Sequence, residues 1–356
     1  MSSDSTIERA ATSDTPAETL VSGLAYTTLM KAIVYRNSGS GEVLKLEEIE
    51  KPVPKDDEVL IKVRAASVNP FDYHMLRHAW LRRVLATLAK VETTRPGRDV
   101  VGQVEAVGSK VSHFTRGDEV FGACNGAFAE YACARESDLA LKPHSVSFAQ
   151  AASTPIAGLT ALQVLRDKAQ VQPGQRVLIN GAAGGVGTFA VQIAKSFGAE
   201  VTGVCSTRNV EMVRSIGADK VFDYTREDFT SSGQHYDVMF DLVANHSFSE
   251  RRRVLTPKGI YIGAGLLGRK LSLIGLLTSG IKESVLALFV TQKFGSFIAK
   301  VNQKDLMAIG ALIEEGKVTP VIDRGYSLSE APEAVSYVEE GHARGKVIID
   351  CVSGDM

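Results

Sequence analysis

Apolar and polar residues alternate in short runs over the first part of the chain from Met30 onward. This alternation predicts strands at 31–35, 44–48, 58–67, 100–107 and 119–122, because a period of two with flanking Gly and Pro residues is typical of strands. Turn-forming clusters at 37–41 and 52–57 separate the first three. The pattern therefore predicts an all-β region.

The period changes near residue 150. Residues 148–169 carry apolar side chains at helical spacing, and beyond them strands alternate with helices. The pattern predicts strands at 176–180, 201–205, 220–223, 237–242 and 259–263, and helices at 187–197 and 210–216. Such alternation indicates parallel βαβ units. Strands at 325–328 and 346–352, with a helix at 331–340, resemble the first region again, so an α/β domain is inserted into a β-rich one.

Composition changes this picture little. The 356 residues suffice for two domains at roughly 150 residues each. The 40 Lys+Arg and 41 Asp+Glu residues leave a net charge of −1, which argues against a nucleic-acid partner or a basic membrane-binding surface. Cys124, Cys133, Cys205 and Cys351 show no C-x-x-C spacing. We therefore expect neither a disulfide framework nor a four-cysteine zinc site, and we expect the protein to reside in a reducing compartment.

Two segments stand apart from the rest. Residues 1–29 are rich in Ser, Thr, Ala and acidic residues, with Arg9 the only basic one, which matches neither a secretory signal nor a mitochondrial presequence. We predict a disordered extension and a cytoplasmic protein. Residues 271–290 are apolar but contain Lys282, Glu283 and serines, whereas a membrane span of about 20 residues carries few charges. We expect a covering helix or a subunit interface there, not a membrane span.

A glycine-rich turn, Gly181-Ala-Ala-Gly-Gly-Val-Gly187, lies between a predicted strand and a predicted helix. A helix N-terminus presents unpaired N–H groups and a positive dipole end, and glycine lets the backbone approach phosphate oxygens. In register with G-x-G-x-x-G, the three positions are Ala182, Gly184 and Gly187. This context predicts a dinucleotide site and not merely a tight turn.

The next strand predicts which dinucleotide binds. It ends in Val204-Cys-Ser-Thr-Arg208, where NAD enzymes usually carry an acidic residue for the ribose hydroxyls. Ser206 can donate a hydrogen bond to a 2′-phosphate, and Arg208 can form a charge-assisted contact with it. We therefore predict NADPH. The alternative is a solvated helix N-terminus, with Ser206 as its cap and Arg208 on the surface.

Six motifs follow one another between residues 30 and 350. They are Ala66-Ser-Val-Asn-Pro-Phe-Asp72, the segments 96–108 and 117–122, Thr154-Pro-Ile-Ala-Gly-Leu-Thr-Ala161, Asn180–Gly187 and Gly345-Lys-Val-Ile-Ile349. Together they resemble the medium-chain dehydrogenase/reductase superfamily, in its zinc-free quinone oxidoreductase and enone reductase branch. The resemblance implies an α/β chain with a GroES-like β-rich catalytic domain (30–153 and 301–356) and a Rossmann domain with a doubly wound parallel sheet (154–300).

Zinc enzymes of this superfamily carry a ligand Cys where this chain has Asn69, and Gly-His-Glu where it has Gly97-Arg-Asp99. The resemblance therefore implies no catalytic metal. It implies cofactor contacts from Thr154, Thr160, Gly184, Gly185, Val186, Gly187, Ser206, Arg208, Tyr224, Asn245, Gly263, Ala264, Gly265 and Lys346. Lys346 either approaches the cofactor or is an exposed strand residue. Homodimers are frequent in this branch, although nothing in the sequence proves one.

The implied reaction moves a hydride from NADPH to the β-carbon of an enone or enal, or to a quinone, with hydrogen-bond donors near the oxygen that gains charge. The candidate catalytic residues are Asn69, Asp72, Tyr73 and His74. Many relatives have a tyrosine where this chain has His74. The proton that completes the reduction then has three possible sources: His74 in place of that tyrosine, Tyr73 turned inward, or solvent. In a purely structural alternative, Tyr73 packs in the core and His74 is exposed.

Other functions are compatible with the same cofactor site. One is an NADPH:quinone reductase proper, and another is a non-catalytic NADPH-binding sensor whose domain closure regulates a partner. An open cleft beside the nicotinamide favours catalysis, and a filled cleft favours the sensor. We expect residues 71–92, with a segment at 78–83 that resembles a helical lid, and residues 266–300 to select the substrate.

Overall fold

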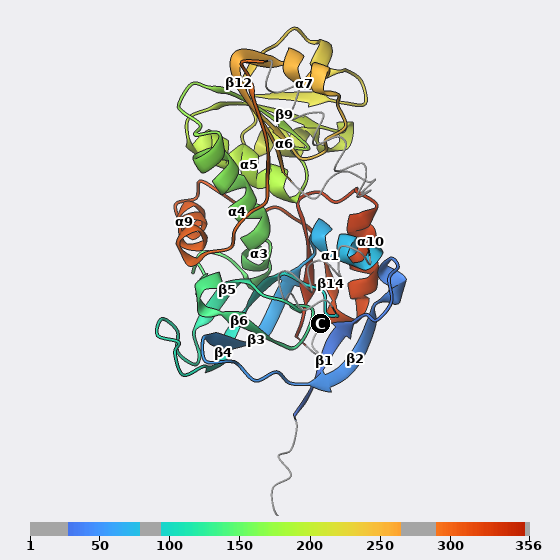
Figure 1. The fold of residues 1–356 in the computed structure, drawn as a ribbon, viewed down its shortest axis with the longest axis vertical. Helices are drawn as coiled ribbons and strands as arrows, with labels where there is room; N and C mark the ends of the chain where they lie inside the picture. Colours follow the sequence, from blue (N-terminus) through green and yellow to red (C-terminus); the bar gives the residue numbers. More distant parts are fainter. Residues whose placement is uncertain (1–27, 79–93, 265–289, 353–356) are drawn as a thin grey trace, which may run out of the picture.

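An antiparallel sheet forms the first domain of the computed structural model, which describes residues 28–78, 94–264 and 290–352. Its strands, in the order of pairing, are β14 (Ile322–Ser327), β15 (Lys346–Asp350), β3 (Glu58–Ser67), β4 (Asp99–Val107), β5 (Glu119–Ala123) and β7 (Leu139–Leu141), with β6 (Tyr131–Arg135) added to β3. Only β14 and β15 run parallel. A separate hairpin joins β1 (Leu29–Val34) to β2 (Lys45–Glu50). The last two strands of the chain, β14 and β15, thus complete the sheet that begins with β3 (Figure 1).

A parallel sheet forms the second domain. Its strand order is β10 (Lys220–Asp223), β9 (Glu200–Cys205), β8 (Arg176–Asn180), β11 (Tyr236–Asp241), β12 (Leu255–Ala264) and β13 (Lys293–Phe297). The order reverses between β8 and β11, as in a doubly wound fold. Both sheets follow from the hydrophobic pattern: the apolar runs of β8 and β11 are buried on both faces, which parallel strands require.

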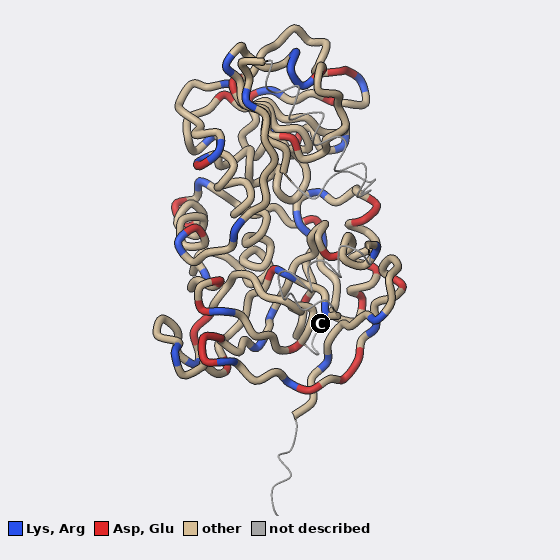
Figure 2. The backbone as a smooth tube through the Cα atoms, viewed as in Figure 1, with Lys and Arg blue, Asp and Glu red and all other residues tan. Residues whose placement is uncertain are grey.

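Helices cover both domains. In the first domain they are α1 (Pro70–Arg77), α3 (Phe148–Ala152) and α10 (Ala331–Glu339), and around the parallel sheet they are α4 (Pro155–Gln163), α5 (Gly185–Ser196), α6 (Val210–Ser215), α7 (Phe248–Arg253) and α9 (Gln303–Glu314). Helix α9 follows the second domain in sequence, yet its Ile309 and Ile313 pack into that domain's core. Acidic and basic residues are interspersed over both domains (Figure 2).

The predicted fold class is confirmed. The strands expected at 58–67, 176–180 and 220–223 coincide with β3, β8 and β10. The pattern missed the helices α1, α7 and α9 and the strands β6, β7 and β13. The residues of the edge strand β13 are half or fully exposed and so lack a clear alternation. The helix expected at 148–169 is divided into α3, α4 and a π-helical turn, Val164–Lys168.

Some predicted segments lie outside the described residues. They include nearly all of the predicted N-terminal extension, most of the lid segment at 78–83 and all but the last residue of the apolar stretch at 271–290. Strand β1 begins at Leu29, the last residue of the predicted extension. Within the part of the chain that is described, no helix is long and apolar enough to cross a membrane.

The two domains meet where β15 begins. The Gly345 N–H donates to the Ala183 carbonyl at 2.8 Å, and Gly345 forms an isolated parallel bridge with Gly184 in the glycine turn. Gly345 has a φ of +74°, and a Cβ on it would lie 2.3 Å from the Val321 carbonyl oxygen. Only glycine fits this position without strain.

We expect Gly345→Ala to lower the free energy of unfolding by about 3 kcal/mol, because it combines a left-handed backbone with a steric overlap. Gly325→Ala is the matched control: Gly325 lies in the neighbouring strand β14 with no atom within 4 Å of an added Cβ. The control is expected to stay within about 1 kcal/mol of the wild type. Urea unfolding measures both, and equal losses in the two variants would contradict the prediction.

Candidate active site

The carboxyl ends of the parallel strands form one edge of the second domain, facing the first. Strands β8 and β11 flank the point where the strand order reverses, and they end at Asn180 and Asp241. Dinucleotides bind doubly wound folds in the crevice at such a point. The sheet topology therefore selects the position of the candidate site before any side chain is considered.

The glycine turn lies at this crevice. Gly184 is the N-cap of α5 and has no side chain to satisfy the helix's first N–H groups, which leaves them for an anion. A Cβ on Gly187 would lie 2.1 Å from the Gly181 carbonyl oxygen, so this position requires glycine. A Cβ on Gly185 would lie 2.8 Å from Cδ of Lys346. The turn thus leaves the first N–H groups of α5 without a side-chain partner, an arrangement that suits an anion such as a pyrophosphate.

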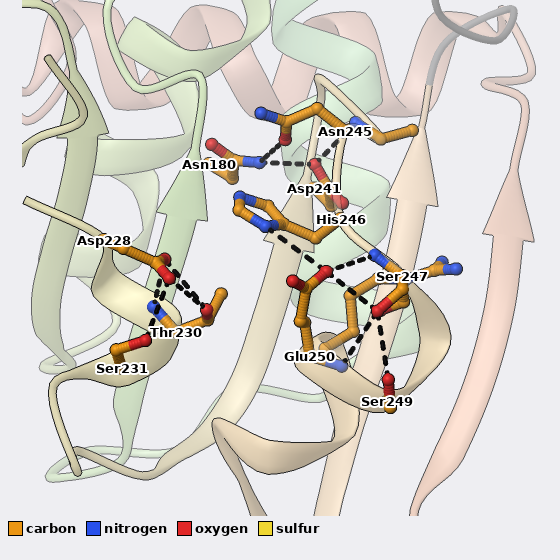
Figure 3. A network of polar contacts seen from close by, with 12 residues as sticks. Asn180, Asp228, Thr230, Ser231, Asp241, Asn245, His246, Ser247, Ser249 and Glu250 are labelled. Atoms are coloured by element: carbon orange, nitrogen blue, oxygen red, sulfur yellow. Dashed lines mark hydrogen bonds and ion pairs between the residues drawn. The ribbon is translucent and has the colours of Figure 1, made fainter.

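Asp241 organises the loop after β11 (Figure 3). Its Oδ1 atom accepts hydrogen bonds from Asn180 Nδ2 at 2.9 Å and from the Val243 and Ala244 N–H groups at 3.0 and 2.9 Å. Asn180 Nδ2 also donates to Asn245 Oδ1 at 3.1 Å. Ala244 has a φ of +54°, a left-handed conformation that a non-glycine residue rarely adopts. The buried carboxylate therefore shapes the loop that presents the exposed Asn245 to the crevice.

The loop continues into a second polar group, also drawn in Figure 3. His246 Nδ1 lies 3.9 Å from Glu250, whose carboxylate also accepts from the Ser247 N–H at 2.7 Å. Asp228 accepts from the Thr230 N–H and hydroxyl, each at 2.8 Å. These contacts fix the start of α7 and the turn after β10.

Strand β9 ends at the position expected for the adenosine ribose. Ser206 Oγ accepts from Asn209 Nδ2 at 3.2 Å, and Arg208 donates from Nη2 to the His342 carbonyl oxygen at 2.5 Å. Tyr224 is 63 % exposed, and its N–H donates to the Cys205 carbonyl oxygen, which brings it beside the end of β9. The structure thus brings Ser206, Arg208 and Tyr224 to one end of the crevice.

Lys346 is buried in the wall opposite the glycine turn. Its ammonium group donates to Asn69 Oδ1 at 2.8 Å, Asp99 Oδ2 at 3.1 Å and the Val68 carbonyl oxygen at 3.3 Å. Only 4 % of Lys346 is exposed, and Asp99 is fully buried. The alternative of an exposed strand residue is therefore wrong.

Asp99 completes this buried cluster. Its Oδ2 atom also accepts from Ser67 Oγ at 2.6 Å and Asn69 Nδ2 at 2.8 Å, and its Oδ1 atom accepts from the Ile156 N–H at 2.9 Å. Four donors thus surround one carboxylate, which makes its burial tolerable. Asp99 lies in the motif at 96–108 but was not among the predicted site residues; an ionisable residue at the start of an apolar strand was the available signal.

Asp72 has a different environment, at the start of α1. Its two oxygens accept from the N–H groups of Asn69 at 2.8 Å and Gly97 at 3.0 Å. Burial raises the pKa of the Asp72 carboxyl to about 6, although these two hydrogen bonds act in the opposite direction. Both oxygens are occupied, so Asp72 positions Asn69 and Gly97.

The remaining predicted residues divide into three groups. His74 is 5 % exposed, with its ring centroid 4.5 Å from that of Tyr73, which packs against the catalytic domain's core. The alternative with His74 exposed is therefore wrong. The Thr154 and Thr160 hydroxyls donate to carbonyls of their own helical segment, those of Gln150 and Ile156.

The third group lies at the end of strand β12. There Gly263 pairs with Asp241 of β11 and is followed by the buried Ala264. Gly265 lies outside the described residues. Val186, between the turn's last glycines, is half-buried and packs against the core of the second domain. Over residues 28–78, 94–264 and 290–352, no three His, Cys, Asp or Glu side chains are grouped so that they could hold a metal ion.

Comparisons with known proteins agree with this architecture. The chain matches the family descriptions "Alcohol dehydrogenase GroES-like domain" over residues 55–144 and "Zinc-binding dehydrogenase" over residues 216–349. It is 36 % identical to the 2-methylene-furan-3-one reductase of Solanum lycopersicum, covering 94 % of this chain and 82 % of that protein. It is 36 % identical to the chloroplastic NADPH-dependent alkenal/one oxidoreductase of Arabidopsis thaliana, covering 90 % and 79 %.

A solved structure, the quinone oxidoreductase from Coxiella burnetii, superimposes with a TM-score of 0.80 at 32 % identity, covering 91 % of this chain and 99 % of that one. Fold and crevice define a two-domain, dinucleotide-dependent oxidoreductase. The chain belongs to the medium-chain dehydrogenase/reductase superfamily, in its quinone and enone oxidoreductase branch.

The expectation of a cytoplasmic protein is wrong. The Arabidopsis relative is chloroplastic, and a Mus musculus relative, "NAD(P)H oxidoreductase RTN4IP1, mitochondrial", is 34 % identical over 92 % of this chain and 91 % of that protein. Both of these relatives are organellar proteins. The composition of residues 1–29, on which the expectation rested, does not decide the compartment.

We expect Lys346→Met to lower the free energy of unfolding by about 3–5 kcal/mol, because it leaves the Asp99 carboxylate buried without its cation. The double variant Lys346→Met/Asp99→Asn should recover part of the loss. Lys317→Met is the control, since Lys317 pairs with Glu315 in an exposed position and should lose no more than about 1 kcal/mol. Urea unfolding of the three variants provides the measurement; a Lys346→Met loss as small as the control's would refute the prediction.

Asp72 should produce a distinct dependence of stability on pH. Its folded pKa of about 6 lies above the ordinary value of 3.8, so the folded state holds the proton more tightly. The stability that Asp72 contributes is therefore fully present below about pH 4 and is lost as pH rises through about 6, a change of about 3 kcal/mol. Urea unfolding from pH 4 to 7 should show wild type losing this amount relative to Asp72→Asn. A difference in the free energy of unfolding between wild type and Asp72→Asn that does not change with pH would contradict this prediction.

Proposed function

We propose that this protein is an NADPH-dependent reductase of α,β-unsaturated carbonyl compounds or quinones that works without a catalytic zinc. The observation that carries the proposal is the junction of the two domains, where the uncapped N-terminus of α5 faces a wall containing the buried Lys346. This arrangement suits a dinucleotide pyrophosphate on one side and a polar substrate site on the other.

The end of β9 supports NADPH over NADH. The segment after β9 carries Ser206 and Arg208 and has no carboxylate of its own until Glu211, and the nearby Asp223 carboxylate on β10 accepts a hydrogen bond from the Thr207 hydroxyl at 2.5 Å. Arg208 at present donates to a neutral carbonyl, that of His342, and a phosphate would be a stronger acceptor for the same guanidinium. The name of the Arabidopsis relative includes NADPH, which supports the same choice.

The wall around Asn69 supports a reaction without zinc. Asn69 stands where zinc enzymes of the superfamily have a ligand Cys, and both polar atoms of its amide are already bound to Asp99 and Lys346. The ammonium group of Lys346 is a resident positive charge among these oxygens. A divalent cation placed beside it would meet like-charge repulsion in a buried site.

We assign binding and positioning roles to the chain's own residues. Gly184, Gly185, Val186 and Gly187 would hold the pyrophosphate, Asn245 and the end of β12 at Gly263 and Ala264 would border the nicotinamide, and Thr154 and Thr160 would flank it. Asp72 and Asn69 hold the substrate-side loop, with Tyr73 and His74 behind them. When bound, the cofactor supplies the hydride; the protein supplies orientation and hydrogen bonds.

Two substrate classes suit this site, and the relatives name both. The tomato and Arabidopsis relatives are a furanone reductase and an alkenal/one oxidoreductase, and the Coxiella structure is a quinone oxidoreductase. The decisive experiment follows NADPH oxidation by absorbance with a panel of enones, 2-enals, quinones and simple ketones. We expect turnover of enones or quinones and none of ketones, unchanged by a chelator. NADPH binding without any turnover would favour the sensor alternative, and chelator-sensitive alcohol oxidation would disprove the proposal.

Arg208→Ala should lower kcat/KM for NADPH about 10- to 100-fold, the equivalent of one charge-assisted hydrogen bond. The value for NADH should change less than twofold, because NADH has no 2′-phosphate. Arg214→Ala is the matched control: Arg214 lies on α6 and pairs with Glu211 in an exposed position. An equal loss with both cofactors would show that Arg208 only holds the loop containing His342.

A further inference from the structure

The residues that we expect to contact the 2′-phosphate come from two neighbouring loops. Strands β9 and β10 pair in parallel, with Cys205 opposite Asp223, so their carboxyl ends lie side by side. Ser206 and Arg208 follow β9, and Tyr224 follows β10. Groups on two separate loops can act on a single phosphate only if the loops keep a fixed spacing.

A carboxylate joins these two loops. Asp223 Oδ2 accepts a hydrogen bond from the Thr207 hydroxyl at 2.5 Å. Thr207 lies between Ser206 and Arg208 in the sequence. Asp223 Oδ1 accepts from the Thr225 N–H at 3.0 Å and from the Thr225 hydroxyl at 2.7 Å, and the two threonine hydroxyl oxygens lie 2.8 Å apart. The loops are therefore held together at residues adjacent to the expected phosphate contacts.

The other contacts of the β9 loop do not set this spacing. Asn209 Nδ2 donates to Ser206 Oγ within the same loop, and Arg208 donates to a carbonyl oxygen of the first domain. The Tyr224 N–H donates to the Cys205 carbonyl oxygen, which aligns the strand ends but not the residues beyond them. Among these contacts, the bond from Thr207 to the carboxylate is the one that fixes residues 206–208 relative to the loop after β10.

Asp223 is charged, yet its environment differs from that of a ribose-binding acid. NAD enzymes carry that acid at the end of the strand after the glycine turn, which is β9 here, whereas Asp223 ends β10 and is only 8 % exposed. The Thr207 hydroxyl holds the pKa of the Asp223 carboxyl below its ordinary value, because donors favour the ionised form. Arg226 Nε, 3.7 Å from Oδ2, offsets part of the charge. Both oxygens are thus directed to the protein's own donors.

We propose that Thr207 and Asp223 form a positioning pair that sets the preference for NADPH over NADH, by holding the loop at 206–208 at the distance from Tyr224 that a 2′-phosphate requires. This inference rests on the proposed function, since it concerns the cofactor of that reaction. The pair acts through Ser206 and Arg208 and does not itself contact the phosphate. Loss of the pair matters because a charge-assisted hydrogen bond weakens steeply when its distance and angle change.

Thr207→Val tests the pair by removing the hydroxyl while nearly keeping the shape of the side chain. We expect KM for NADPH to rise about 5- to 10-fold, the equivalent of one hydrogen bond. KM for NADH should change less than twofold, and kcat at saturating NADPH should also stay within twofold, because the pair acts on binding and not on hydride transfer. Thr207→Ser restores the hydroxyl and should bring KM for NADPH back to within twofold of wild type.

Thr115→Val is the matched control. Thr115 is exposed, as Thr207 is, and its hydroxyl also donates to a carboxylate, that of Asp118 at 3.2 Å in the first domain. This variant should change neither KM by more than twofold. An equal rise of KM for NADPH and NADH in Thr207→Val would overturn the inference, because it would show a general loosening of the adenosine site.

Asp223→Asn separates positioning from charge repulsion. It removes the negative charge and weakens the bond to Thr207, so positioning predicts a KM for NADPH about 3- to 10-fold higher than that of wild type. A carboxylate that merely repelled the 2′-phosphate would give the opposite result. An unchanged or lower KM for NADPH in Asp223→Asn would therefore refute the positioning role.

A binding measurement separates this inference from the proposed reaction. Isothermal titration calorimetry with NADP⁺ and NAD⁺ requires no turnover, and wild type should bind NADP⁺ at least tenfold more tightly. Thr207→Val should lose most of this difference and keep its affinity for NAD⁺. If wild type shows the difference but reduces neither enones nor quinones, the proposed reaction fails and the inference stands. If Thr207→Val keeps the full difference, or if wild type shows none, the inference is wrong even where enones or quinones are reduced.

Discussion

A buried ammonium group at the domain junction constrains the rest of the structure. Lys346 can remain charged away from water only if it is surrounded by acceptors, and Asn69, Asp99 and the Val68 carbonyl provide them. These acceptors come from the end of β3 and the start of β4, while Lys346 begins the last strand. One charge therefore aligns the first and last parts of the catalytic domain, and its stem closes over the phosphate turn at Gly185.

The cofactor side of the crevice depends on a second buried charge. Asp241 ends β11 and binds Asn180, which ends β8, across the point where the strand order reverses. It also holds the two N–H groups that give the following loop its left-handed residue, Ala244. Since Asn245 comes next, the position of a side chain at the mouth of the crevice is set by a carboxylate beneath it. Surface loops that position ligands generally need such support from a rigid element.

The sequence by itself determined the fold class, the core strands and the glycine turn. Periodicity reports which face of a local segment is buried, so β3, β8 and β10 were located to the residue, and the strand–turn–helix context of Gly181–Gly187 predicted the candidate cofactor site. The edge strand β13 was not predicted, because an exposed strand has no such periodicity. The candidate residues at the end of β9 were also found, since the absence of an acid is visible in sequence.

Only the tertiary structure decided which polar residues share an environment. The bond between Lys346 and Asn69 joins residues 277 positions apart, and nothing in local pattern reports such a distance. The burial of His74, the roles of Asp99 and Asp241, and the meeting of Arg208 with the His342 carbonyl have the same origin. A buried polar group must find its partner wherever the sheet topology brings one within hydrogen-bond distance, and topology is a property of the whole chain.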